Sequence, residues 1–177
     1  MKKQRVVGAA ELAQLVEGLA AEIAARAGKT GNLALVGIKR RGVPLAERLA
    51  RLLAGHGRPG IPVGAIDITL YRDDLQLVAE TPIVRGTEIS FDINGRELVL
   101  VDDVIFTGRT TRAALSELLD YGRPAAIRLA VLVDRGNREL PIAPDFTGRA
   151  LATRPQDLVD ICLEETDGED AVYLTRR

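Results

Sequence analysis

Two adjacent carboxylates and a Thr-Gly turn lie close together at residues 99–111, which read Val-Leu-Val-Asp-Asp-Val-Ile-Phe-Thr-Gly-Arg-Thr-Thr. The apolar start of this stretch predicts the end of a buried strand. Asp102 and Asp103 then follow at the carboxyl end of that strand, where open α/β sheets bind their ligands. Ionised carboxylates accept hydrogen bonds, so this pair suits the hydroxyl groups of a ligand.

The turn that follows leads directly into a predicted helix and consists of Thr107, Gly108, Arg109, Thr110 and Thr111. Gly108 permits a positive φ or a close backbone approach. The hydroxyl groups and the first N–H groups of the helix can surround a phosphate, helped by the helix dipole. An Asp-Asp pair or a Thr-Gly start alone is often only a polar loop or a cap. In this order, the two together predict a site for a ribose 5-phosphate.

Several other kinds of site are excluded by what the sequence lacks. The 99–111 segment contains neither the Gly-Lys-Ser/Thr of a Walker A loop nor the three spaced glycines of a dinucleotide fingerprint. Cys162 is the single cysteine and His56 the single histidine, which argues against a disulfide, a cysteine metal site and a Ser-His-Asp triad. The net charge of -1 gives no global sign of nucleic-acid binding.

Alternating helical and strand patterns must position this segment. Helices are expected at residues 9–27, from about 42 to 54, and at 110–121. Strands are expected at residues 33–38, 63–71, 97–101 and 127–133, and more weakly at 159–164 and 172–174. The pattern predicts one α/β domain over residues 1–177, with a mostly parallel twisted sheet flanked by helices.

Two further features bear on location and on access to the site. The longest apolar runs, such as residues 33–38, fall far short of the roughly 20 residues of a membrane span. The polar, basic N-terminus does not resemble a secretory signal, so we expect a cytoplasmic protein with no membrane partner. Residues 72–94 form a long irregular connection, which inside a compact domain is usually functional and often a lid.

The stretch at 99–111 closely resembles the signature with which type I phosphoribosyltransferases bind phosphoribosyl pyrophosphate (PRPP). Three other stretches, at 36–42, 67–74 and 132–141, resemble the PyrR family, whose members are bifunctional pyrimidine-operon regulators and uracil phosphoribosyltransferases. The resemblance covers most of the chain. It implies the type I phosphoribosyltransferase fold, with a flexible lid at about 72–90 and a small hood at about 134–165.

The resemblance also implies a role for individual residues. Asp102 and Asp103 would contact the ribose hydroxyls, and the 107–111 turn would hold the 5-phosphate. The other roles are pyrophosphate binding by Lys39, Arg40, Arg41 and Gly42, lid contacts by Tyr71, Arg72, Asp73 and Arg85, and uracil binding by Arg135 and Val159. Mg²⁺ is the expected cofactor, held mainly by PRPP, with Asp102 and Asp103 as its candidate protein ligands.

The implied reaction joins uracil to the ribose of PRPP and gives UMP and pyrophosphate. The implied second activity is binding of pyrimidine operon leader RNA when UMP or UTP is present. Such binding needs clustered basic residues. Candidates in a homodimer or homotetramer are Arg138 and Arg149, with Arg5, Arg26 and Arg128.

Some positions depart from the pattern of the family's regulators. Glu17, Gly18 and Ala21 stand where those proteins tend to carry polar, basic or His residues, and Asn137 replaces a usual His. These departures keep open the alternative of a PRPP-dependent base-salvage enzyme without RNA binding. A non-catalytic PRPP-binding regulator is a third hypothesis.

Overall fold

The computed structural model describes residues 2–28, 31–68 and 86–177. The predicted lid residues Tyr71, Arg72, Asp73 and Arg85 lie outside the described residues, as does most of the predicted lid. No helix of the described chain is long and apolar enough to cross a membrane.

Helices and strands alternate through most of the chain. The elements are β1 (Lys2–Val7), α1 (Ala9–Arg26), β2 (Leu33–Ile38), α2 (Gly42–Gly55), β3 (Val63–Ile66), β4 (Glu97–Ile105), α3 (Arg109–Tyr121), β5 (Ala126–Asp134), β6 (Phe146–Ala150), β7 (Leu158–Cys162), α4 (Glu164–Asp167) and β8 (Ala171–Arg176).

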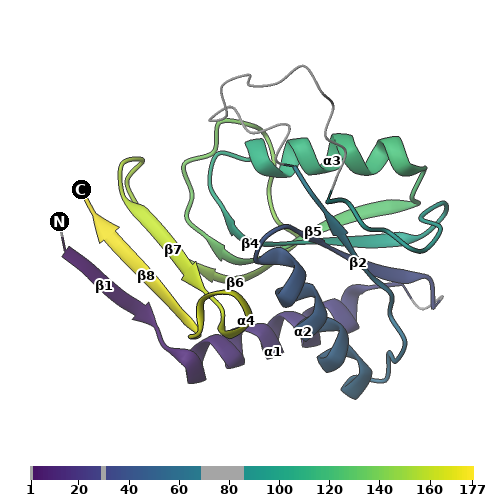
Figure 1. Cartoon of the computed structure of the whole chain (residues 1–177), viewed down its shortest axis with the longest axis horizontal. Helices are drawn as coiled ribbons and strands as arrows, with labels where there is room; N and C mark the ends of the chain where they lie inside the picture. Colours follow the sequence, from purple (N-terminus) through teal and green to yellow (C-terminus); the bar gives the residue numbers. More distant parts are fainter. Residues whose placement is uncertain (1, 29–30, 69–85) are drawn as a thin grey trace.

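The main sheet has five parallel strands in the order β3-β2-β4-β5-β6, with α1 and α2 on one face and α3 on the other (Figure 1). Every residue of β2 is buried. Leu33 and Leu35 pack in the core beneath α1 and α2, whereas Ala34, Val36 and Ile38 pack in the core beneath α3. A strand covered on both faces needs apolar residues at consecutive positions, which explains the continuous apolar run and confirms the predicted strand.

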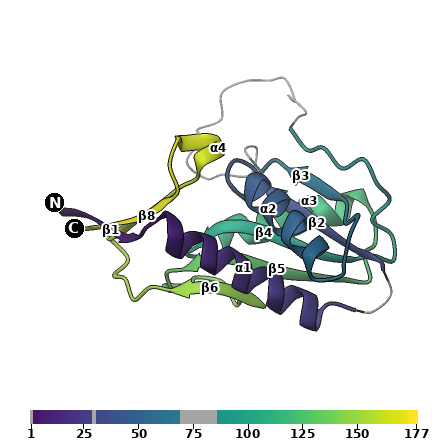
Figure 2. The ribbon, with the colours of Figure 1, turned by 90° about the horizontal axis from the view of Figure 1, so that it is seen from below.

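A second, antiparallel sheet of three strands, in the order β1-β8-β7, lies beside the main sheet (Figure 1). It pairs Lys2 with Arg176, so both ends of the chain lie together. The short helix α4 connects β7 to β8 and lies near the start of α2 (Figure 2). The predicted hood at 134–165 therefore includes β6, a strand of the main sheet, and leaves out β1 and β8.

The end predicted for the strand at 97–101 is wrong. β4 continues to Ile105, because its pairing with β5 persists through Asp102 opposite Val131 and Val104 opposite Val133. The acid pair thus belongs to the strand itself, which gives both side chains a rigid base. The prediction for the preceding strand errs in the opposite direction, because β3 ends at Ile66, before the predicted end at residue 71.

The turn after β2 lies unusually close to its neighbours. A Cβ atom on Gly37 would lie 2.5 Å from the carbonyl oxygen of Gly42, and one on Gly42 would collide with the carbonyl oxygen of Val101. Real Cβ atoms do not approach backbone so closely, so glycine is required at both positions. The absence of side chains here lets the 39–42 turn press against β4.

We expect Gly42→Ala to destabilise the fold by about 1–3 kcal/mol, because the added methyl group forces the turn away from β4. Gly18→Ala is the matched control, since Gly18 is exposed within α1 and a Cβ there has nothing within 4 Å. That change should stabilise the protein by about 0.5–1 kcal/mol through its helix propensity. Urea unfolding followed by circular dichroism measures both effects. Equal effects of the two substitutions would contradict the close approach.

Candidate active site

A pocket of about 430 Å³ opens at the carboxyl ends of β2 and β4. It brings together residues from the turn after β2, from β4, from the start of α3 and from β7 of the small sheet. Its lining is Ile38, Lys39, Arg40, Arg41, Ile68, Asp102, Asp103, Val104, Thr110, Val159, Asp160 and Ile161. The predicted acid pair, the predicted cationic turn and Val159 therefore meet in one place.

The acid pair is largely withdrawn from solvent. Asp102 is 6% exposed, and one of its carboxylate oxygens accepts the backbone N–H of Asp103 at 2.9 Å. Asp103 accepts the N–H of Val104 at 2.8 Å, and its other oxygen lies 4.0 Å from Nη1 of Arg41. Burial raises the pKa of Asp103, and the Val104 N–H and the Arg41 charge oppose that rise. The pair thus offers carboxylate oxygens to a ligand at a partly dry surface.

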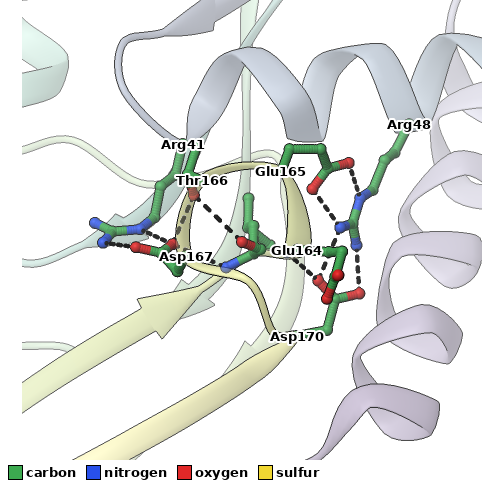
Figure 3. Close-up of polar contacts among 8 residues, drawn as sticks. Arg41, Arg48, Glu164, Glu165, Thr166, Asp167 and Asp170 are labelled. Carbon is green, nitrogen blue, oxygen red and sulfur yellow. Dashed lines mark hydrogen bonds and ion pairs between the residues drawn. The ribbon is translucent and has the colours of Figure 1, made fainter.

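The cationic turn supplies the opposite charge. Arg41 holds Asp167 through two hydrogen bonds, Nε to Oδ2 and Nη2 to Oδ1, each of 2.9 Å (Figure 3). Arg40 donates from Nη2 to the carbonyl oxygen of Thr166 at 3.1 Å, and Lys39 Nζ lies 3.4 Å from Glu88. The turn that carries α4 therefore anchors both arginines at the pocket.

The Thr-Gly turn has the backbone conformation that its sequence predicts. Gly108 has a φ of 91°, in the left-handed region, and α3 begins at the next residue. Of the five predicted phosphate contacts, Thr110 lines the pocket described above, whereas Thr107, Gly108 and Thr111 do not, and Arg109 pairs with Glu139 at 2.7 Å. The carbonyl oxygen of Thr107 accepts the N–H groups of Glu139 and Leu140, at 3.0 and 3.2 Å. The segment that follows β5 therefore holds the Thr-Gly turn in place through these two backbone hydrogen bonds.

Arg135, a predicted uracil contact, is not among the described residues that line the pocket. Its guanidinium stacks on the ring of Phe106 at 3.9 Å and donates to the carbonyl oxygens of Arg154 and Pro155, at 3.0 and 3.3 Å. It is 6% exposed, and burial lowers its pKa. Arg135 therefore braces Phe106, next to the Thr-Gly turn, against the loop that leads into β7.

The arginines predicted to meet RNA mostly have carboxylate neighbours. These pairs are Arg26–Glu22, Arg128–Glu97, Arg138–Asp134 and Arg149–Glu11. Arg138 also donates to the carbonyl oxygens of Phe106 and Ile142, and its side chain is 22% exposed. It thus holds the Thr-Gly turn in place, while Arg5 lies exposed on β1.

The acidic turn around α4 is the part of the site that sequence reasoning missed. It carries Glu164, Glu165, Asp167 and Asp170, a run of acids that reads as a solvated loop. Its only sequence signal is that several acids stand close together before an apolar strand. Nothing local indicates that Asp167 meets Arg41, because the two are far apart in the chain.

Comparisons with known proteins agree with this geometry. The sequence profile of the phosphoribosyl transferase domain matches residues 7–158. The bifunctional protein PyrR of Picosynechococcus sp. is 52% identical over 172 residues, which cover 97% of this chain and 96% of that protein. The bifunctional protein PyrR of Thermus thermophilus is 51% identical over 175 residues, covering 99% and 97%. The chain belongs to the PyrR family.

Solved structures show that this PyrR-family chain has the predicted fold. Hypoxanthine phosphoribosyltransferase from Trypanosoma cruzi superposes with a TM-score of 0.73 at 20% identity, over 97% of this chain and 94% of that one. The Staphylococcus aureus hypoxanthine phosphoribosyltransferase gives a TM-score of 0.71 at 16% identity, over 98% and 92%. The predictions of the family and of the type I phosphoribosyltransferase fold are confirmed.

Asp103→Asn should make this PyrR-family protein more stable at pH 7. Because burial raises the pKa of Asp103, the folded state holds the proton more tightly than the unfolded chain. The ionised carboxylate therefore costs stability above the folded-state pKa and costs nothing below the unfolded value. The gain from Asn should be largest at neutral pH and shrink as the pH falls through the folded-state pKa.

Urea unfolding of both proteins between pH 7 and pH 4 measures this difference. Asp120→Asn, on an exposed position of α3, is the control for loss of a carboxylate. A gain that grows as the pH falls would have the opposite sign and would contradict a raised pKa.

Proposed function

We propose that the protein is a uracil phosphoribosyltransferase, which converts uracil and PRPP to UMP and pyrophosphate. The observation that carries this proposal is the meeting of Asp102 and Asp103 with Arg40 and Arg41 at one pocket. The carboxylates accept the ribose hydroxyls, and the guanidiniums receive the pyrophosphate through charge-assisted hydrogen bonds. The Thr-Gly turn holds the 5-phosphate at the start of α3.

The spacing of these groups suits a substrate whose pyrophosphate is attached to the ribose. Arg41 lies 4.0 Å from Asp103, so the two parts of the site are adjacent. Departure of pyrophosphate leaves positive charge on the ribose, and the neighbouring carboxylates favour that charge. The residues of the pocket thus accelerate transfer by positioning both substrates and by neutralising charge, without a protein nucleophile. Val159 provides apolar surface for the base.

The carboxylates of Asp102 and Asp103 also fit Mg²⁺, which prefers oxygen ligands. The described residues contain no group of three or more His, Cys, Asp or Glu side chains that would hold a metal. We propose that the ion would be held mainly by PRPP, with these two carboxylates as its protein ligands. When bound, the ion would neutralise the charge that develops on the departing pyrophosphate.

The second proposed activity is binding of pyrimidine operon leader RNA in the presence of UMP or UTP. It is supported by relatives that carry the name bifunctional protein PyrR and match nearly the whole chain at about half identity. UMP has the ribose and the 5-phosphate that the pocket is proposed to bind, so one site serves catalysis and sensing. We propose that the protein acts in the cytoplasm as a homodimer or homotetramer.

The alternative is a salvage enzyme without RNA binding. It is favoured by the carboxylate partners of Arg26, Arg128, Arg138 and Arg149, which reduce the positive charge available to phosphates. Exposed ion pairs are weak, at about 0–1 kcal/mol, so an RNA phosphate can replace the carboxylate where the arginine is accessible. A binding measurement separates the two functions.

Incubation with Mg²⁺, PRPP and one base at a time tests the enzyme. We expect UMP and pyrophosphate from uracil, and no nucleotide from orotate, hypoxanthine or guanine. Asp103→Asn should lower turnover on the order of a hundredfold, because it removes a charge that favours the transition state. Product from a purine or from orotate would overturn the base assignment. Binding of PRPP without any product would overturn the enzymatic role.

Filter binding of a leader stem-loop RNA tests the regulatory activity. We expect affinity to rise when UMP is added, and to fall with salt because phosphate contacts release counterions. A scrambled RNA of equal length and charge is the control. Equal binding of both RNAs, with or without UMP, would favour the salvage enzyme.

A further inference from the structure

The acidic turn at residues 163–170 is joined to the rest of the molecule by two sets of ion pairs (Figure 3). In one set, Asp167 pairs with Arg41 at the pocket. In the other, Glu165 and Asp170 both hold Arg48 of α2, each at 2.8 Å from a guanidinium nitrogen. Only the first set involves a residue that lines the pocket. A substitution in the second set therefore tests only the attachment of the turn, whereas a substitution in the first set also affects a residue of the pocket.

Asp167 contacts Arg41 along one edge of its guanidinium. Nε and Nη2 each donate at 2.9 Å, whereas Nη1 is turned toward the acid pair, 4.0 Å from Asp103. A guanidinium has five N–H donors, and a two-point carboxylate contact uses two of them. Within the part of the chain that the structure describes, the remaining donors make no hydrogen bond, and Arg41 lines the pocket.

Asp167 is itself held rigidly. Its Oδ2 accepts the backbone N–H of Leu163 at 3.0 Å and the hydroxyl of Thr166 at 2.6 Å. Its side chain is 17% exposed, and the hydrogen bonds from Arg41 keep its pKa far below the usual range. The carboxylate is therefore charged and fixed before any ligand arrives.

We propose that Asp167 is a positioning residue for the pyrophosphate half of the site, which holds Arg41 with its free donors directed at the diphosphate. This inference rests on the proposed function. An arginine fixed in its binding geometry loses less conformational freedom when it binds an anion, so orientation strengthens binding. The negative charge of Asp167 acts in the opposite direction, because it competes for the same cation. The sign of the effect of Asp167→Asn decides between these two influences.

We expect Asp167→Asn to raise the KM for PRPP and the Kd of Mg-pyrophosphate by about tenfold, through lost preorganisation of Arg41. The Kd of UMP should change less than twofold, because UMP has no pyrophosphate group. Asn keeps an oxygen for the Leu163 N–H, so the turn retains that hydrogen bond. Asp167→Glu, which keeps the carboxylate, should recover part of the affinity. Calorimetry with pyrophosphate and with UMP, beside steady-state kinetics, gives these values.

Glu165→Gln is the matched control. It weakens the contact of the same turn with Arg48 and leaves the Arg41–Asp167 contact in place, so pyrophosphate affinity should stay within twofold of the unaltered protein. An equal loss in Glu165→Gln and Asp167→Asn would show that attachment of the turn matters, and would overturn the proposal. Tighter pyrophosphate binding by Asp167→Asn would show that Asp167 competes with the ligand, and would overturn it too.

Arg41→Ala separates this inference from the proposed function. Normal pyrophosphate affinity in Arg41→Ala would refute Arg41 as a pyrophosphate ligand, and the role of Asp167 with it. Weak binding by Arg41→Ala together with normal binding by Asp167→Asn would leave the proposed function standing and refute the positioning role alone.

Discussion

The parallel pairing of β2 with β4 sets the distance between the cationic turn and the acid pair. Its register places Gly37 opposite Val101, one residue before Asp102. Parallel strands bring their carboxyl ends to the same edge, so whatever follows β2 must meet the end of β4. The glycines at 37 and 42 let the turn lie against β4 rather than arch away. The cationic turn and the acid pair thus face each other at short range, and each is carried by rigid backbone.

The two adjacent carboxylates need a positive charge nearby, and the turn between β7 and β8 of the antiparallel sheet helps to hold that charge in place. Two carboxylates next to each other at the end of a buried strand repel one another and lose solvation. Arg41 compensates for this, and Asp167 compensates in turn for Arg41. The alternation of charge continues through Arg48, Glu165 and Asp170, which fasten the same turn to α2. The antiparallel sheet therefore forms one wall of the pocket and also fixes the charges of the opposite wall.

Sequence reasoning located the parts whose signal is local. The apolar run of β2, the helical spacing of α1 and the Thr-Gly turn before α3 each report their structure within a few residues, and the structure agrees with them. It failed where structure depends on distant partners. β1 is polar and basic and becomes a strand only through pairing with β8 at the other end of the chain. The acids of the α4 turn have the composition of a solvated loop until the fold brings Arg41 and Arg48 to them.

Arg135 has contacts that its position in the sequence does not indicate. The family resemblance predicts that Arg135 contacts the base, and this stays a prediction; in the structure its guanidinium stacks on Phe106 and donates to the carbonyl oxygens at 154 and 155. A sequence indicates that an arginine lies near a site, but not whether it faces the ligand or supports the wall behind it. The distinction depends on acceptors contributed by another loop, whose position only the tertiary structure fixes.

The charge arrangement also bears on how one pocket can serve both catalysis and sensing. When pyrophosphate has left, Arg41 keeps Asp167 as a two-point partner and Asp103 nearby, so its charge is compensated without a ligand. Under the proposed function, Arg41 is then not left as an uncompensated cation when the complex holds UMP alone. A half-buried charge without a partner is costly, and Asp167 meets that cost equally in the free protein and in the UMP complex, so departure of pyrophosphate does not weaken the binding of UMP. That complex is the one a uridylate sensor must populate, and the same carboxylate that orients Arg41 for pyrophosphate compensates the charge of Arg41 after pyrophosphate departs.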